Sequence, residues 1–239
     1  MGWEYFYFAF VFFLAGIVPE LTGFGVATVS MVFLSFVLPL HIAIPLVAII
    51  SLTATGIVAF HTKAKGFFKY LKPLLLGSFV GVFLGMLFLS LVREDLLRTI
   101  LAIFFIVYAF YGLFLKNYFF PMNRKIGTTV GLVAGFFGAS FNIHGPFVGL
   151  YSSASNHLSK IEIKDLIATY MFITGLFTVA GHFLFGRITG EVLNYVLFVL
   201  PFLFVGLFVG KKIFERTSAA WVKRYIYFFV LIAGIMLLI

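Results

Sequence analysis

The stretch GFFGASFNIHGPF at residues 135–147 decides how this chain can fold, because it sets polar residues inside strongly apolar sequence. Side chains such as Asn142 and His144 are expensive in a bilayer, so they are expected where the protein interior or a ligand supplies partners. The dipeptide that follows, Gly145-Pro146, suits the start of a new helix, since the missing proline N–H has no partner in a first turn. We therefore expect a polar break between two helices here.

The composition around this break is that of a membrane protein. Of 239 residues, 63% are apolar and 10% are charged, whereas about 25% of a soluble domain is charged. One soluble core of this size does not bury so much apolar surface, but a bilayer accepts it. The sequence predicts an all-α, multi-pass protein of the cell membrane. Its apolar segments run over 5–18, 24–38, 42–60, 70–92, 95–115, 127–141, 145–158, 163–186, 191–210 and 219–239.

Four of these segments are too short to span a bilayer, and they form two adjacent pairs. One pair, 127–141 and 145–158, flanks the polar break described above, and the other, 5–18 and 24–38, is joined by a break at residues 19–23. A helix that restarts at Gly23 or Phe24 presents free amide groups and the positive end of its dipole, which together attract anions. Thr22 can cap that helix or donate its hydroxyl to a ligand. The alternative is a tight turn whose glycines only allow close packing. Either pair can be a re-entrant hairpin or two tilted spans.

Two residues are candidates for carrying a proton. Glu20 is framed by apolar sequence, and an intramembrane carboxylate is a functional hypothesis by default; the alternative places it in water near the surface. His144 titrates near neutrality, with a buried structural histidine as the alternative. His182 lies near the end of a span and is expected in the interface between membrane and water. The candidate substrate-binding residues are Thr22, Gly23, Phe24, Gly25, Thr55, Ser140, Asn142, His144, Gly145 and Thr174.

The two halves of the chain resemble each other. Gly16 and Gly135 lie 119 positions apart, as do Thr55-Gly56 and Thr174-Gly175. The glycine pairs at 81 and 85 and at 206 and 210 match at a spacing of 125 positions. We expect an internal duplication, with repeat 1 at residues 1–120 and repeat 2 at residues 121–239. Each repeat would hold one short pair plus three transmembrane helices.

The basic residues cluster in loops and predict the topology. Residues 61–72, 116–125 and 211–224 are basic and are expected in the cytoplasm, whereas 93–98 and 187–191 are mixed and are expected outside. The net charge of +9 fits loops that face anionic lipid. The basic residues are scattered among short loops, which argues against nucleic-acid binding. This topology makes the two repeats inverted. Inverted repeats with discontinuous helices are typical of secondary transporters, whose sites lie near the midplane.

No sequence motif points to an enzyme, a metal site or a cofactor. The chain has no phosphate-binding loop, no nucleophile elbow and no zinc-binding helix motif. The remaining alternatives are a channel-like anion pore on the same fold and a membrane scaffold without transport activity. Continuous helices would serve a scaffold better than broken ones. A coupling proton or sodium ion, and assembly into a homodimer, are further hypotheses.

At these residues the chain resembles the TauE/SafE family, also called the sulfite exporter or toluenesulfonate uptake permease family. The resemblance covers nearly the whole length. Its motifs are Gly16-x6-Gly23-Phe24-Gly25, the run 27–39 with 41–43, Gly135-x2-Gly138 and residues 142–147. The resemblance implies transport of a sulfur oxyanion or organosulfonate, such as sulfite, a sulfonate or sulfoacetate. Val26, Asn142 and His144 depart from the denser glycine pattern of the family, which leaves the ligand open.

Overall fold

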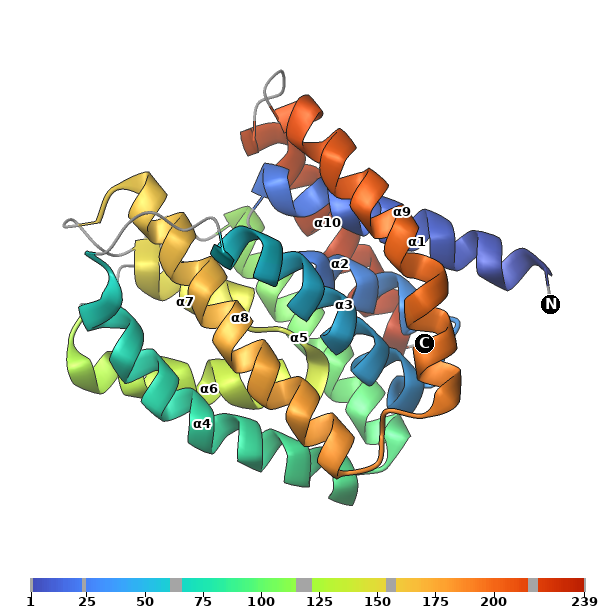
Figure 1. Ribbon diagram of the computed structural model, residues 1–239, viewed down its shortest axis with the longest axis horizontal. Coiled ribbons are helices and arrows are strands. Elements are labelled where there is room, and N and C mark those ends of the chain that lie inside the picture. Colours follow the sequence, from blue (N-terminus) through green and yellow to red (C-terminus); the bar gives the residue numbers. More distant parts are fainter. Residues whose placement is uncertain are drawn as a thin grey trace. The chain divides into compact units, whose positions relative to one another are not determined.

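The computed structural model describes residues 2–22, 25–60, 66–114, 122–153, 158–214 and 219–238. These ranges hold ten helices (Figure 1). Their bounds are α1 (Gly2–Thr22), α2 (Gly25–Leu34), α3 (Leu40–Phe60), α4 (Phe68–Leu91), α5 (Glu94–Phe114), α6 (Arg124–Phe141), α7 (Gly145–Ser153), α8 (Lys160–Leu184), α9 (Gly190–Phe214) and α10 (Ala219–Leu238). The ten predicted apolar segments are confirmed as helices, and the all-α prediction holds for the described ranges.

The predicted end of the first helix is wrong. It was expected near residue 18, but α1 continues through Pro19 and Glu20 to Thr22. A proline inside a helix of this kind is tolerated, because neighbouring groups satisfy the carbonyl that loses its partner. The first interruption is therefore shorter than expected and falls at residues 23–24, outside the described residues.

Contacts divide the chain into two compact units. Unit 1 comprises residues 1–47, 92–116 and 188–239, and unit 2 comprises residues 48–91 and 117–187. Each unit takes helices from both halves of the sequence, so the units and the predicted repeats are different divisions of the chain. The repeat boundary near residue 120 stays a prediction.

In unit 2, α4 and α6 pack with their backbones in direct contact (Figure 1). A methyl group added at Gly85 would lie 2.6 Å from the carbonyl oxygen of Phe136, and one added at Gly81 would overlap the carbonyl of Leu132. Small residues spaced by four are what allow two membrane helices to approach this closely. The glycines of α4 therefore serve helix packing.

In unit 1, α1 and α9 pack through the same arrangement. A methyl group added at Gly210 would lie 2.7 Å from the carbonyl oxygen of Ile17, and one added at Gly206 would overlap the carbonyl of Phe13. These contacts correspond to those between α4 and α6 at the spacings of 125 and 119 positions found in the sequence. The two helix pairs therefore pack in matching registers, and the duplication itself stays a prediction.

Both short pairs are hairpins that return on themselves. In unit 1 the Tyr7 hydroxyl, near the start of α1, donates to the carbonyl of Phe33 at the end of α2 over 2.9 Å. In unit 2 the Tyr151 hydroxyl, near the end of α7, lies 2.7 Å from where a methyl group at Gly127 would sit, in the first turn of α6. In each unit the chain thus comes back to the end from which its hairpin started.

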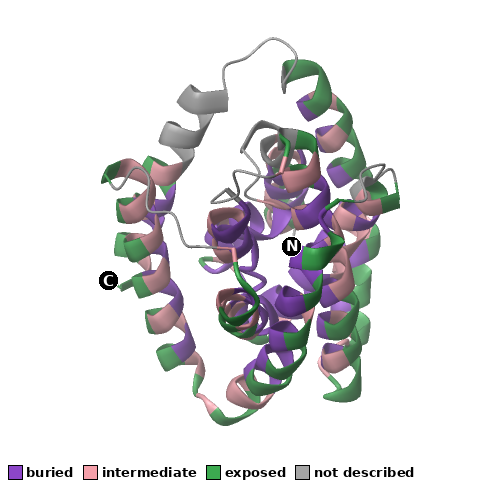
Figure 2. Ribbon diagram, turned by 90° about the vertical axis from the view of Figure 1, so that its left-hand side faces the viewer, coloured by how far each residue is buried: buried purple, intermediate pink, exposed green. Residues whose placement is uncertain are grey.

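The outer faces of the helices are apolar. On α4 the exposed residues Leu76, Phe79, Val80 and Phe83 follow helical spacing and lie opposite the packed glycines. Figure 2 shows buried and exposed residues on opposite sides of individual helices. Within the described residues, five helices are long and apolar enough to cross a membrane: α3, α4, α5, α8 and α9. This arrangement, apolar outside and close-packed within, is that of a multi-pass membrane protein.

Candidate functional site

The break between α6 and α7 forms as the sequence predicted. Asn142 ends α6 in the left-handed conformation, with φ 59° and ψ 25°, and its backbone N–H donates to the carbonyl of Gly138 over 2.8 Å. Asparagine is one of the few residues that adopt this conformation at low cost. The chain then passes Ile143 and His144 and starts α7 at Gly145. Asn142 and His144 are both buried.

His144 is the central group of this break. Its side chain is buried, at 3% exposure, and its ring makes a hydrogen bond to the backbone of Ala134. The second ring nitrogen, Nδ1, has no hydrogen-bond partner among the described residues. The ring lies against Gly138, where an added methyl group would overlap it. A buried polar atom without a partner is uncommon and costs free energy, so Nδ1 is a candidate group for binding a ligand.

A hydrogen-bonded group on α4 and α8 lies beside this histidine. The ring of Tyr170 packs edge-on against the His144 ring, with the ring centroids 6.4 Å apart. The Tyr170 hydroxyl and the Ser78 hydroxyl are 2.6 Å apart, and Ser78 is 2.9 Å from the carbonyl of Gly131 on α6. These contacts join α4, α6 and α8 beside the break, where the Tyr170 ring meets His144.

A buried polar stripe runs along α8. Its members follow every four residues, which places them on one face of the helix. They are Tyr170, Thr174, Thr178 and His182, and all are buried. The Thr174 hydroxyl donates to the carbonyl of Tyr170 over 2.7 Å, but the Thr178 hydroxyl and both nitrogens of His182 lack partners within the described part of the chain. At 1.5 Å per residue the stripe is about 18 Å long.

The stripe corrects one prediction and adds residues that the sequence analysis missed. His182 was expected in the interface, but it is fully buried. Gly138, Tyr170 and Thr178 were not among the candidate site residues. The spacing of four between polar residues on an apolar helix was the available signal for the stripe. No sequence pattern predicts the contact between Gly138 and His144, because this contact depends on how α7 folds back on α6.

Other predicted residues occupy different surroundings. Ser140 is buried, and its hydroxyl is 3.5 Å from the carbonyl of Gly85, which is a long distance for a hydrogen bond. The Thr55 hydroxyl donates to the carbonyl of Ser51 in its own helix over 2.8 Å. Thr55 is therefore not joined to the polar stripe by any described contact, whereas Thr174 belongs to it.

The first break belongs to unit 1. Gly25 starts α2 with φ 77°, a backbone conformation that glycine adopts freely and other residues do not. Gly23 and Phe24 lie outside the described residues. Glu20 and Thr22 belong to the last turns of α1, but the description does not extend to their side chains. Their proposed roles stay predictions.

The model of the family described as sulfite exporter TauE/SafE matches residues 8–237, which is nearly the whole chain. No curated protein and no solved structure matches the sequence.

Proposed function

Because the chain belongs to the sulfite exporter TauE/SafE family, we propose that it is a secondary transporter that moves a small sulfur oxyanion or organosulfonate across the membrane. The observation that carries this proposal is His144, a buried histidine in the break between α6 and α7 whose Nδ1 has no partner among the described residues. The family supplies the class of substrate. The break supplies a place where such an anion can be bound.

The chemistry of the break suits an anion that arrives with a proton. One nitrogen of the neutral His144 ring is engaged with the backbone of Ala134, which leaves Nδ1 as an acceptor without a donor. Protonation turns Nδ1 into a charged donor, and an anion in a low-dielectric site needs such a donor. The start of α7 adds amide groups and the positive end of its dipole. Proton and anion would then bind together.

The described arrangement corresponds to a closed state of the hairpin. The His144 ring lies against Gly138, so Nδ1 gains access to a ligand only when α7 moves away from α6. A transporter alternates between closed and open arrangements of one site. The buried stripe on α8 extends from Tyr170 toward the other end of the helix and offers polar groups along the way.

The remaining elements of the proposal rest on the sequence. The first break, with Thr22, Gly25 and Glu20, would form the second half of the substrate site, and the two repeats would be inverted. Residues 61–72, 116–125 and 211–224 would be cytoplasmic. The coupling ion, proton or sodium, and a homodimer stay predictions.

The test is sulfite flux into proteoliposomes at several pH values. Saturable flux that follows a proton gradient is expected, with apparent affinity rising as the pH falls, because a bound anion favours the protonated ring of His144. His144→Gln keeps a hydrogen-bond donor but removes the charge, so it should flatten this dependence. The control is His41→Gln, because His41 is exposed and faces Glu94 at 3.3 Å.

Two outcomes would contradict the proposal. Steep, non-saturating conduction would indicate the channel-like alternative. An unchanged pH profile with intact affinity in His144→Gln would make His144 a structural residue and shift the proton role to Glu20.

A further inference from the structure

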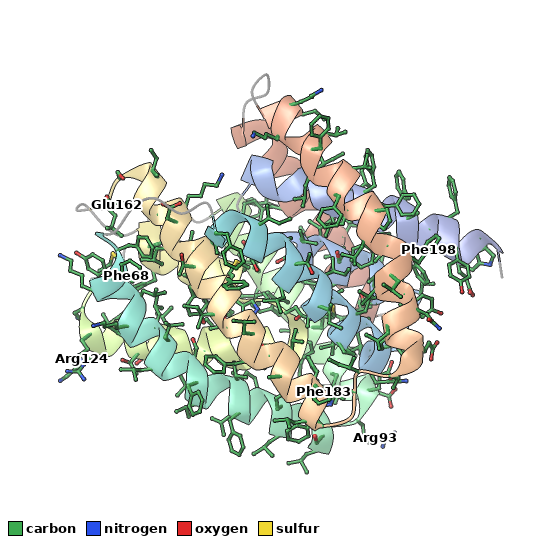
Figure 3. All side chains as sticks on the ribbon, viewed as in Figure 1. Phe68, Arg93, Arg124, Glu162, Phe183 and Phe198 are labelled. Carbon is green, nitrogen blue, oxygen red and sulfur yellow. The ribbon has the colours of Figure 1, made fainter. Side chains whose placement is uncertain are left out.

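A second polar site lies at the other end of the α6–α7 hairpin, away from the break. A cavity of about 600 Å³ opens between the first turns of α4 and α6. Its charged lining consists of Lys69, Lys72 and Arg124, and no acidic side chain is among the described residues that line it. Figure 3 shows Phe68, at the start of α4, and Arg124, at the start of α6, at the same end of unit 2. The cavity is therefore strongly basic.

The three cations are available to a ligand. None of them forms an ion pair with another described residue. The Lys69 ammonium group lies over the Tyr70 ring, 4.7 Å from its centroid. Three uncompensated cations around one cavity repel each other, and a bound anion removes that cost.

The start of α6 points its positive end into the same cavity. Asn123 caps the helix, and its side chain accepts from the N–H of Ile126 over 2.9 Å. The first amides of a helix have no intrahelical partner, and together with the dipole they favour a negative group. Asn123 itself lines the cavity. The backbone thus adds to the attraction of the side chains.

An independent observation points to a ligand. Tyr151 on α7 lines the cavity, is buried at 1% exposure, and has a hydroxyl without a hydrogen-bond partner among the described residues. This hydroxyl lies beside Gly127 of α6 and close to Pro73 of α4. A buried hydroxyl that lacks a partner costs free energy unless something binds to it.

We propose that this cavity binds a phosphate-type oxyanion, carried by an anionic lipid headgroup or free in solution. The site shares no residue with the break, so the proposal goes beyond the transport function. The cations and the Tyr151 hydroxyl supply donors for the oxyanion. Leu76 contributes an apolar surface to the cavity lining, and it lies on the exposed apolar face of α4. Basic pockets between membrane helices on the cytoplasmic side are typical sites for such headgroups.

The test measures binding to the purified full-length protein by native mass spectrometry and by thermal unfolding in detergent. The probes are phosphatidylglycerol, phosphatidylcholine and inorganic phosphate. Phosphatidylglycerol or phosphate should bind and raise the unfolding temperature, whereas phosphatidylcholine, which has no net charge, should not. A response to phosphatidylglycerol alone assigns the lipid headgroup, and a response to inorganic phosphate assigns the free anion.

Variants locate the site. Lys72→Gln and Arg124→Gln should each weaken binding roughly tenfold, as expected for a charged hydrogen bond, and Tyr151→Phe about threefold. The matched control is Lys125→Gln, because Lys125 is adjacent to Arg124 but does not line the cavity. Equal weakening by Lys125→Gln would show an effect of net charge only and would overturn the proposal, as would unchanged binding in all cavity variants. This readout does not depend on transport, so its failure leaves the proposed transport function untouched.

Discussion

Gly138→Ala is the most direct perturbation of the break, because the added methyl group overlaps the His144 ring. An alanine in place of glycine inside a helix normally stabilises the helix by about 1 kcal/mol. Forcing an extra methyl group into a packed site costs about 1–3 kcal/mol. The net expectation is a loss of roughly 1 kcal/mol, which lowers the unfolding temperature by about 2–4 °C for a chain of this size.

The assay is thermal unfolding of the purified protein, with two comparisons. Gly149→Ala on α7 is the control, because nothing lies within 4 Å of the added methyl group, and it should be neutral or stabilising. In a His144→Ala background the overlap is gone, so Gly138→Ala should then stabilise the protein. A double-mutant cycle of this kind isolates the contact between the two residues. If Gly138→Ala destabilised both backgrounds equally, the overlap with His144 would not be the cause.

Three further predictions concern other parts of the molecule. Ser78→Ala should cost about 1–3 kcal/mol, because it leaves the buried Tyr170 hydroxyl without its partner, whereas Tyr170→Phe should cost about 1 kcal/mol; equal losses in chemical unfolding would argue against the hydrogen bond. Gly25→Ala should lose about 1–2 kcal/mol in the same assay, because φ is 77° there, and a neutral result would contradict this backbone conformation. The chain has no cysteine, so Lys212→Cys and Arg93→Cys can be labelled without background, from the cytoplasmic side and from outside respectively. Labelling of both from one side would refute the predicted topology.

Much of the fold follows from patterns that the sequence carries locally. Apolar segments between charged breaks predict the ten helices, and Asn142 with Gly145-Pro146 predicts the break between α6 and α7. The extent of α1 was not predictable in this way, because a proline such as Pro19 ends a helix in water but is tolerated where other helices satisfy the backbone.

The candidate site was predictable only in part, for a physical reason. Asn142 and His144 stand out because polar residues are rare in such sequence. Thr178 and His182 share the spacing of four with Tyr170 and Thr174, but only tertiary packing decides whether that face of α8 meets lipid or the interior. The contact between Gly138 and the His144 ring depends on the return of α7 along α6, which the sequence pattern does not encode.

The composition of the two units has a consequence for how the protein is made. The crossing of α1 and α9 joins residues near Gly16 with residues near Gly206, and unit 1 contains helices from both ends of the chain. Helices are synthesised from the N-terminus onward, so α1 enters the membrane long before its packing partner exists. The face of α1 that carries Gly16 is therefore covered by lipid or by the insertion machinery until α9 has been synthesised. The last helix of unit 2, α8, is complete at residue 184. All helices of unit 2 are therefore synthesised before α9 and α10, the last two helices of unit 1.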